Sequence, residues 1–137
     1  VWAFAKTIGE REGLDAHTLE TLELTAVVHD IACPLCRKKY GDTDGKHQER
    51  ESAPLVAAFF AEPLFAGADV ARISYIVSHH HTYTDVDGID YQILLEADFL
   101  VNADESGLSS AAIAAAKERI FRTAAGGRLL CSMYIRR

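Results

Sequence analysis

The chain has 137 residues, of which 49% are hydrophobic and 25% are charged, as is typical of one soluble globular domain. Its 20 acidic residues outnumber its 14 lysines and arginines and give a net charge of −6, which argues against a nucleic-acid polymer as a partner. No apolar run approaches the roughly 20 residues of a membrane-spanning helix, and three cysteines are too few for a disulfide scaffold, so we expect a cytoplasmic protein that does not bind membranes.

Hydrophobic spacing predicts helices from the first residue onward. The apolar face of residues 1–12 begins without a cap, so we expect the chain to start inside a helix that is truncated before residue 1. Asp15 caps a second helix over 16–29, which ends before Pro34 because a residue that precedes proline is driven out of the α region. The turn-rich polar segment 35–46 predicts a loop, which we interpret as a candidate lid.

The remaining apolar stripes predict further helices at about residues 48–61, 69–77 and 90–103 and from Ser109 onward. We expect the pair Gly126-Gly127 to interrupt the last of these before a short final helix. No segment shows the alternation of apolar and polar residues that is typical of a strand. We therefore predict a single all-α domain, residues 1–137, with about six to seven helices.

Histidine or aspartate stands on the apolar face of three predicted helices. His29 and Asp30 end the stripe of the second helix, the histidines at 79–81 follow the stripe of the fourth, and Asp98 lies within that of the fifth. Each group alone has a structural explanation, namely a helix cap, a solvated helix end or a lone hydrogen-bonding carboxylate. Because unpaired buried carboxylates are costly, their joint occurrence favours a divalent cation, and nitrogen and oxygen ligands suit Mn, Fe, Co, Ni, Zn or Mg.

These motifs resemble the HD superfamily of metal-dependent phosphohydrolases, in which a histidine, a His-Asp pair and a distal aspartate all lie on helices. Residues 26–30, which read Ala-Val-Val-His-Asp, match the His-Asp helix end, and residues 94–100 match the segment of the last ligand. The run at 76–80, Ile-Val-Ser-His-His, matches the histidines that serve a second metal. The resemblance covers nearly the whole chain, and the metal ligands that it implies are His29, Asp30, Asp98, His79 and His80.

The chain departs from the family pattern at two ligands. The first histidine of the pattern would lie upstream of Val1, and Gln48 stands where a further histidine is usual, with His47 one position early. For this reason the sequence supports one metal better than two.

The resemblance implies hydrolysis of a phosphate ester without a side-chain nucleophile. The cation would polarise a phosphoryl oxygen and lower the pKa of water for in-line attack. Asp30 would ligate the metal and orient the water, while His79 or His80 would ligate a second metal or give a proton to the leaving oxygen.

The predicted lid supplies candidate substrate contacts. Lys38, Lys39 and Lys46 follow His29 closely and are candidate phosphate ligands. A local group of cations on an acidic chain favours a small anionic phosphorylated substrate, such as a nucleotide or another phosphomonoester. Two alternatives stay open: a metal-binding regulatory module without turnover, and a di-iron oxygenase of the same superfamily.

The pair Cys33 and Cys36 forms a Cys-x-x-Cys motif, which can be a redox dithiol or half of a zinc site. Cys131 is the only other cysteine, and a thioredoxin-like dithiol needs a βαβ context, so we expect these side chains to pack beside the metal site instead.

Overall fold

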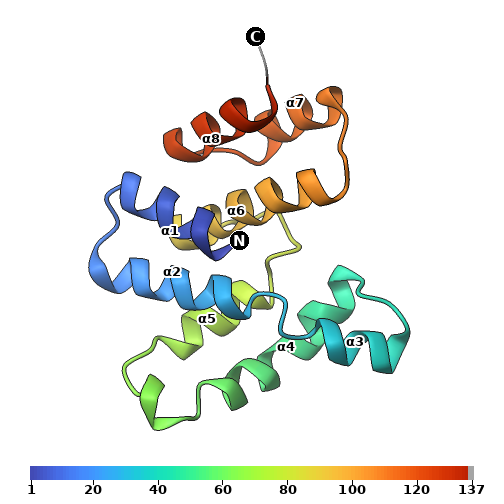
Figure 1. Cartoon of the computed structure of the whole chain (residues 1–137). Coiled ribbons are helices and arrows are strands. Elements are labelled where there is room, and N and C mark those ends of the chain that lie inside the picture. Colours follow the sequence, from blue (N-terminus) through green and yellow to red (C-terminus); the bar gives the residue numbers. More distant parts are fainter. Residues whose placement is uncertain (136–137) are drawn as a thin grey trace.

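The computed structural model describes residues 1–135, so Arg136 and Arg137, the last two residues of the predicted domain, lie outside the described residues. The described part is all-helical, which confirms the predicted fold class (Figure 1). Its elements are α1 (Trp2–Arg11), α2 (Ala16–Val28), α3 (Cys33–Tyr40), α4 (Gly45–Phe59), the short 3-10 helix η1 (Pro63–Phe65), α5 (Val70–Val77), α6 (Ile89–Glu105), α7 (Ser110–Arg119) and α8 (Ala124–Tyr134). Among residues 1–135, no helix combines the length and the apolar character that crossing a membrane requires.

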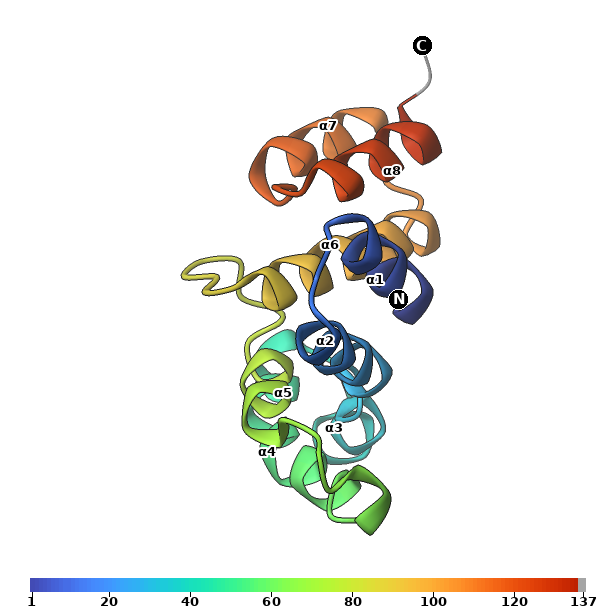
Figure 2. The same cartoon turned by 90° about the vertical axis from the view of Figure 1, so that its left-hand side faces the viewer.

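Helix α6 is the centre of the fold. It packs against α1, α2 and α8, and Figure 2 shows α7 and α8 on one side of it and α2 with α5 on the other. The larger hydrophobic cluster joins apolar side chains of α1, α2, α6, α7 and α8, whereas a smaller one lies among α2, α4 and α5. Because α6 is enclosed from both sides, its residues from Ile93 to Asp98 are all buried, including the two acids Glu96 and Asp98.

The segment predicted as a polar loop and lid contains helix α3. Pro34 stands in the first turn, where proline is tolerated. Arg37, Lys38 and Lys39 occupy the last turn, where cations are favoured by the helix dipole, and Gly41 ends the helix in the left-handed conformation with φ 76°. The prediction of a loop here was wrong because the polar composition hid these helix signals, and only Gly41 to Asp44 connects α3 to α4.

The boundary between the last two helices also differs from the prediction. Gly126 and Gly127 lie inside α8, and the break falls earlier, between Arg119 and Ala124. Thr123 caps α8 by accepting a hydrogen bond from Gly126 N, which is 3.0 Å from its hydroxyl. Gly126 is needed for a close approach, because a Cβ atom there would lie only 1.9 Å from Glu96 Oε1.

Candidate metal centre

His29 and Asp30 leave the end of α2 and turn toward α6. The His29 ring is 9% exposed, and its Nδ1 lies 2.7 Å from the carbonyl oxygen of Ala26. A carbonyl can only accept, so Nδ1 carries a hydrogen and Nε2 is left with its lone pair or a second proton. This backbone contact fixes the ring so that Nε2 faces two carboxylates, as the outer hydrogen bonds of metal-binding histidines do.

Those two carboxylates belong to Asp30 and Asp98. His29 Nε2 lies 3.1 Å from Asp30 Oδ2 and 3.4 Å from Asp98 Oδ1, although neither contact has the alignment of a hydrogen bond. Burial lowers the pKa of His29, but the two carboxylates outweigh it and raise the pKa to about 10. Burial raises the pKa of Asp30, but its contacts with His29 and His80 hold it well below the usual range. The structure thus brings together three side chains that the helical spacing predicted to meet.

His80 and His81 complete the cluster from the turn after α5. His80 is fully buried, its Nδ1 lies 2.7 Å from the carbonyl oxygen of Val77, and its Nε2 lies 3.6 Å from Asp30 Oδ1. One potential ligand atom each from Asp30, His80 and His81 lie within 4.8 Å of one another. The Asp30 carboxylate therefore faces His29 with one oxygen and His80 with the other, and at 52% exposure it also reaches solvent.

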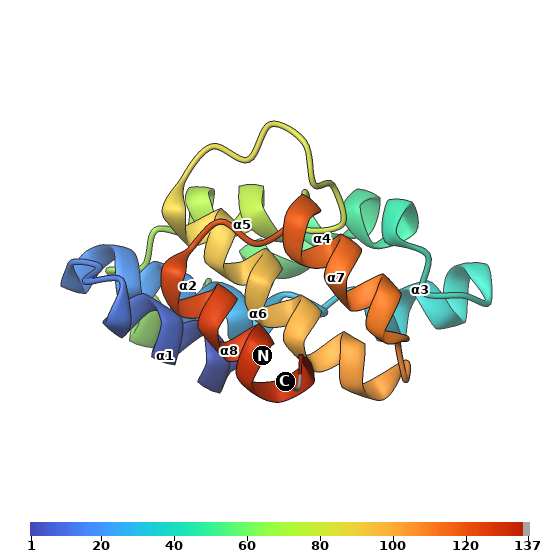
Figure 3. The same ribbon diagram turned by 90° about the horizontal axis from the view of Figure 1, so that it is seen from above.

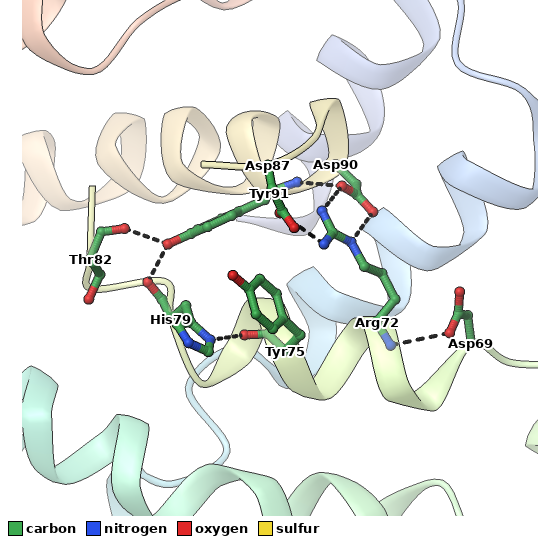
Figure 4. Close-up of polar contacts among 8 residues, drawn as sticks. All are labelled: Asp69, Arg72, Tyr75, His79, Thr82, Asp87, Asp90 and Tyr91. Carbon is green, nitrogen blue, oxygen red and sulfur yellow. Dashed lines mark hydrogen bonds and ion pairs between the residues drawn. The ribbon is translucent and has the colours of Figure 1, made fainter. Parts of the chain in front are cut away.

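His79, expected as a ligand, lies outside this cluster. Its ring stacks on Tyr75 with centroids 4.2 Å apart, and its Nδ1 lies 2.6 Å from the Tyr75 carbonyl oxygen (Figure 4). Helix α5 ends at Val77, so the helical spacing no longer governs residues 78–81, which form a turn. The turn directs His81 instead of His79 toward Asp30.

Three nitrogen atoms of the cluster are buried without a hydrogen-bond partner among residues 1–135, namely Nε2 of His29, His80 and His81. Buried polar atoms are nearly always hydrogen-bonded, so exceptions need an explanation. Histidine nitrogens around a shared carboxylate fit a divalent cation, which would displace the second proton of His29 and accept lone pairs from the neutral rings. The residues present therefore fit the group that the sequence predicts, and the metal itself stays a prediction.

The start of α4 packs against the same cluster. A Cβ atom at Gly45 would lie 2.8 Å from the His81 ring, so glycine permits this approach. Gln48 stands one turn later at the position where the resemblance expects a histidine. Its Nε2 donates to the Thr43 carbonyl oxygen at 2.7 Å, and its Oε1 is buried with no hydrogen-bond partner in the described part of the chain.

Tyr91 anchors the turn that carries His80 and His81, and Arg72 ties α5, which precedes this turn, to α6; sequence reasoning missed both contacts. The Tyr91 hydroxyl lies 2.6 Å from the His79 carbonyl oxygen and 2.5 Å from that of Thr82 (Figure 4). Arg72 binds Asp90 with two hydrogen bonds of 2.7 and 3.0 Å. The sequence did offer one clue to Tyr91, because a tyrosine on the apolar face of a helix needs a partner for its hydroxyl. Arg72 and Asp90 are 18 residues apart, and no spacing pattern links them.

The predicted phosphate contacts lie on α3 and α4. Lys39 Nζ is 2.7 Å from Glu51 Oε1, and Lys46 Nζ is 3.5 Å from Glu49 Oε2, so carboxylates balance both charges. Lys38 is exposed in the last turn of α3. The role of these lysines in substrate binding stays a prediction.

The cysteines of the Cys-x-x-Cys motif are free thiols on α3. Burial, followed by the charge of Asp30, raises the pKa of Cys33, and burial raises that of Cys36. Both shifts favour the neutral thiol, which is a poor nucleophile and a poor metal ligand.

Comparison with protein-family models, with curated proteins and with solved structures finds no match to this chain. The class that the fold and the site define is an all-helical protein with a histidine and carboxylate cluster where α2, α5 and α6 meet.

Proposed function

We propose that this protein is a metal-dependent phosphohydrolase of the HD type, acting on a small phosphorylated substrate. The observation that carries the proposal is the convergence of three unpartnered histidine nitrogens with the carboxylates of Asp30 and Asp98. The sequence resemblance to the HD superfamily supports the same reading.

His29, Asp30 and Asp98 would hold the cation, with His80 and His81 on the other side of Asp30. A divalent cation supplies Lewis-acid chemistry there, since it polarises a phosphoryl oxygen and makes water more acidic. Asp30 is the most exposed member of the cluster, and its position between the two sets of histidines lets it orient the attacking water. His80 Nε2 would either ligate a second metal or, in the protonated ring, give a proton to the leaving oxygen.

The substrate class follows from charge. A chain with net charge −6 disfavours a polyanion but accepts a compact anion where cations gather. A nucleotide or another phosphomonoester fits this requirement, and Lys38, Lys39 and Lys46 lie on the elements beside the cluster.

Metal analysis combined with a phosphatase screen tests the proposal. The purified protein is loaded in turn with Mn, Fe, Co, Ni, Zn or Mg and assayed on nucleotides and sugar phosphates. We expect Asp30→Ala to abolish bound metal and hydrolysis together. The matched control Asp104→Ala, at an exposed position of α6, and the change Cys33→Ser should keep both.

The alternatives appear as other outcomes of the same screen. Bound metal without hydrolysis of any substrate would replace the hydrolase with a metal-binding regulatory module. Oxygen consumption by the iron form would identify a di-iron oxygenase, although Gln48 at an expected histidine position disfavours it. Loss of metal in Cys33→Ser but not in Asp30→Ala would contradict the site itself.

A further inference from the structure

A cavity of about 230 Å³ lies between the α5–α6 connection, α6 and the end of α7. Its polar lining comes from Tyr83, Gln92, Arg119 and Arg122, and its apolar lining includes Leu95 and Ile120. Figure 3 shows the connection from α5 to α6 looping out on the side of the molecule where α7 ends. Because α7 is distant from the metal cluster in sequence, the sequence analysis did not predict this cavity.

The cavity adjoins the candidate metal centre. Leu95 lines it, and Asp98 stands three residues later on α6, so both side chains lie on the same face one turn apart. Tyr83 lines it as well and follows the His80-His81 turn by two residues. Tyr83 and Arg119 therefore line one cavity beside the face of α6 that carries Asp98.

The two arginines bring positive charge to the cavity lining. Within residues 1–135, neither Arg119 nor Arg122 forms an ion pair. Arg122 Nη1 donates to the carbonyl oxygens of Glu118 and Phe121, both at 2.9 Å, so its guanidinium is fixed in place. Buried Glu96 is already saturated, because Gln92, Arg122 N and Thr123 donate hydrogen bonds to it.

We propose that this cavity binds a second anionic group of the substrate, with Arg119 as its principal ligand and the Tyr83 hydroxyl as a further donor. Guanidinium groups pair with phosphate and carboxylate in a planar, bidentate geometry, which suits a preformed anion subsite. The substrate class is then a small organic phosphate that carries a second phosphate or a carboxylate. The assignment of this group to the substrate rests on the proposed function, whereas anion binding by the cavity does not.

Anion binding is tested first without metal and without turnover. Inorganic phosphate is titrated into metal-free protein, and the thermal midpoint is recorded for the unmodified chain, Arg119→Gln and the control Arg128→Gln, an exposed arginine of α8. We expect saturable stabilisation of the unmodified chain and of the control, and about tenfold weaker phosphate binding in Arg119→Gln. Arg119→Lys, which keeps the charge, should recover part of the affinity and excludes a folding defect. Equal binding in all four proteins would overturn the subsite.

The substrate class is tested next with metal-loaded protein. Glucose 1,6-bisphosphate and 6-phosphogluconate are each compared with glucose 6-phosphate, which lacks the second anionic group. We expect kcat/KM of the unmodified chain to favour one of the first two, and Arg119→Gln to reduce that preference about tenfold, while the control Arg128→Gln keeps it. The favoured compound distinguishes phosphate from carboxylate. If the unmodified chain showed no preference for a substrate with two anionic groups, the substrate assignment would be overturned. If the protein bound phosphate in the cavity but hydrolysed none of the substrates, the proposed function would be refuted and the anion subsite would stand.

Discussion

Two buried acids of α6, Glu96 and Asp98, should respond to substitution in opposite ways. Glu96 is fully buried and accepts hydrogen bonds from Gln92 Nε2 at 2.6 Å, from the backbone N of Arg122 and Thr123 at 3.1 Å, and from the Thr123 hydroxyl at 2.6 Å. Asp98 faces His29 instead. We therefore assign Glu96 to stability, because it ties the α7–α8 connection to α6, and Asp98 to metal binding.

The contacts of Glu96 set the size of the effect. Glu96→Ala removes the acceptor for four donors in a buried place, and each unsatisfied group costs about 1–3 kcal/mol, part of which water entering the space restores. We expect a loss of about 3–5 kcal/mol in the free energy of unfolding. Glu96→Gln keeps one oxygen for the three donors to Oε2, so it should cost only about 1 kcal/mol. Gly126→Ala drives a Cβ atom into Glu96 Oε1 and should cost about 1–3 kcal/mol.

Urea denaturation in excess chelator measures these free energies, and metal analysis of the same variants separates stability from function. Glu96→Gln should keep its metal, whereas Asp98→Asn should lose metal and should cost the metal-free protein less stability than Glu96→Ala, since it removes only one of the two carboxylates beside His29. Our reasoning would be refuted if Glu96→Ala cost less than Glu96→Gln, or if Glu96→Gln lost metal while Asp98→Asn kept it.

The remaining predictions concern the turn after α5, its anchor Tyr91 and the contact of Arg72 with Asp90. His81→Ala should lower metal stoichiometry or affinity, and His79→Ala should not, as equilibrium dialysis against the metal will show; equal effects would contradict the placement of His79. Tyr91→Phe should weaken metal binding about tenfold while it leaves the helix content unchanged, because the turn loses its anchor, and unchanged affinity would exclude a positioning role. Burial raises the pKa of Asp90 but the Arg72 guanidinium outweighs it, so the net pKa is lowered from 3.8. Its stabilising contribution is therefore complete above pH 3.8 and is lost as the pH falls below it, and denaturation at pH 3 and pH 6 should show a smaller pH effect in Arg72→Met.

The sequence predicted the part of the site that lies on a helix or directly follows one. Asp98 lies on the apolar stripe of α6, and His29 and Asp30 directly follow that of α2, so the period of 3.6 residues still indicates their direction. The family resemblance implied His79 and left out His81, but α5 ends at Val77 and the turn geometry directs these two side chains.

Long-range contacts had no sequence signal at all. The cavity beside Asp98 joins Tyr83 to Arg119, which are far apart in the chain, so only the packed structure reveals their proximity. Helix α3 was missed for a different reason, since its exposed face is strongly basic and only Cys36 among its residues is buried. A short helix with so little apolar surface has almost no periodic signal.

The position of the cluster explains why its polar groups can be both buried and reactive. His29 and Asp30 follow the last residue of α2, and His80 and His81 follow the last residue of α5, so neither pair interrupts a helix. Helix α6 covers them with Asp98, while the Asp30 carboxylate stays 52% exposed. Unpartnered groups at the centre of a helix bundle would oppose folding. At the helix ends they keep access to solvent through Asp30, and a cation that binds the folded chain alone would stabilise it by about 2.7 kcal/mol at 100 times its Kd. If saturating metal failed to raise the free energy of unfolding, metal binding would not explain why these buried nitrogens lack hydrogen-bond partners.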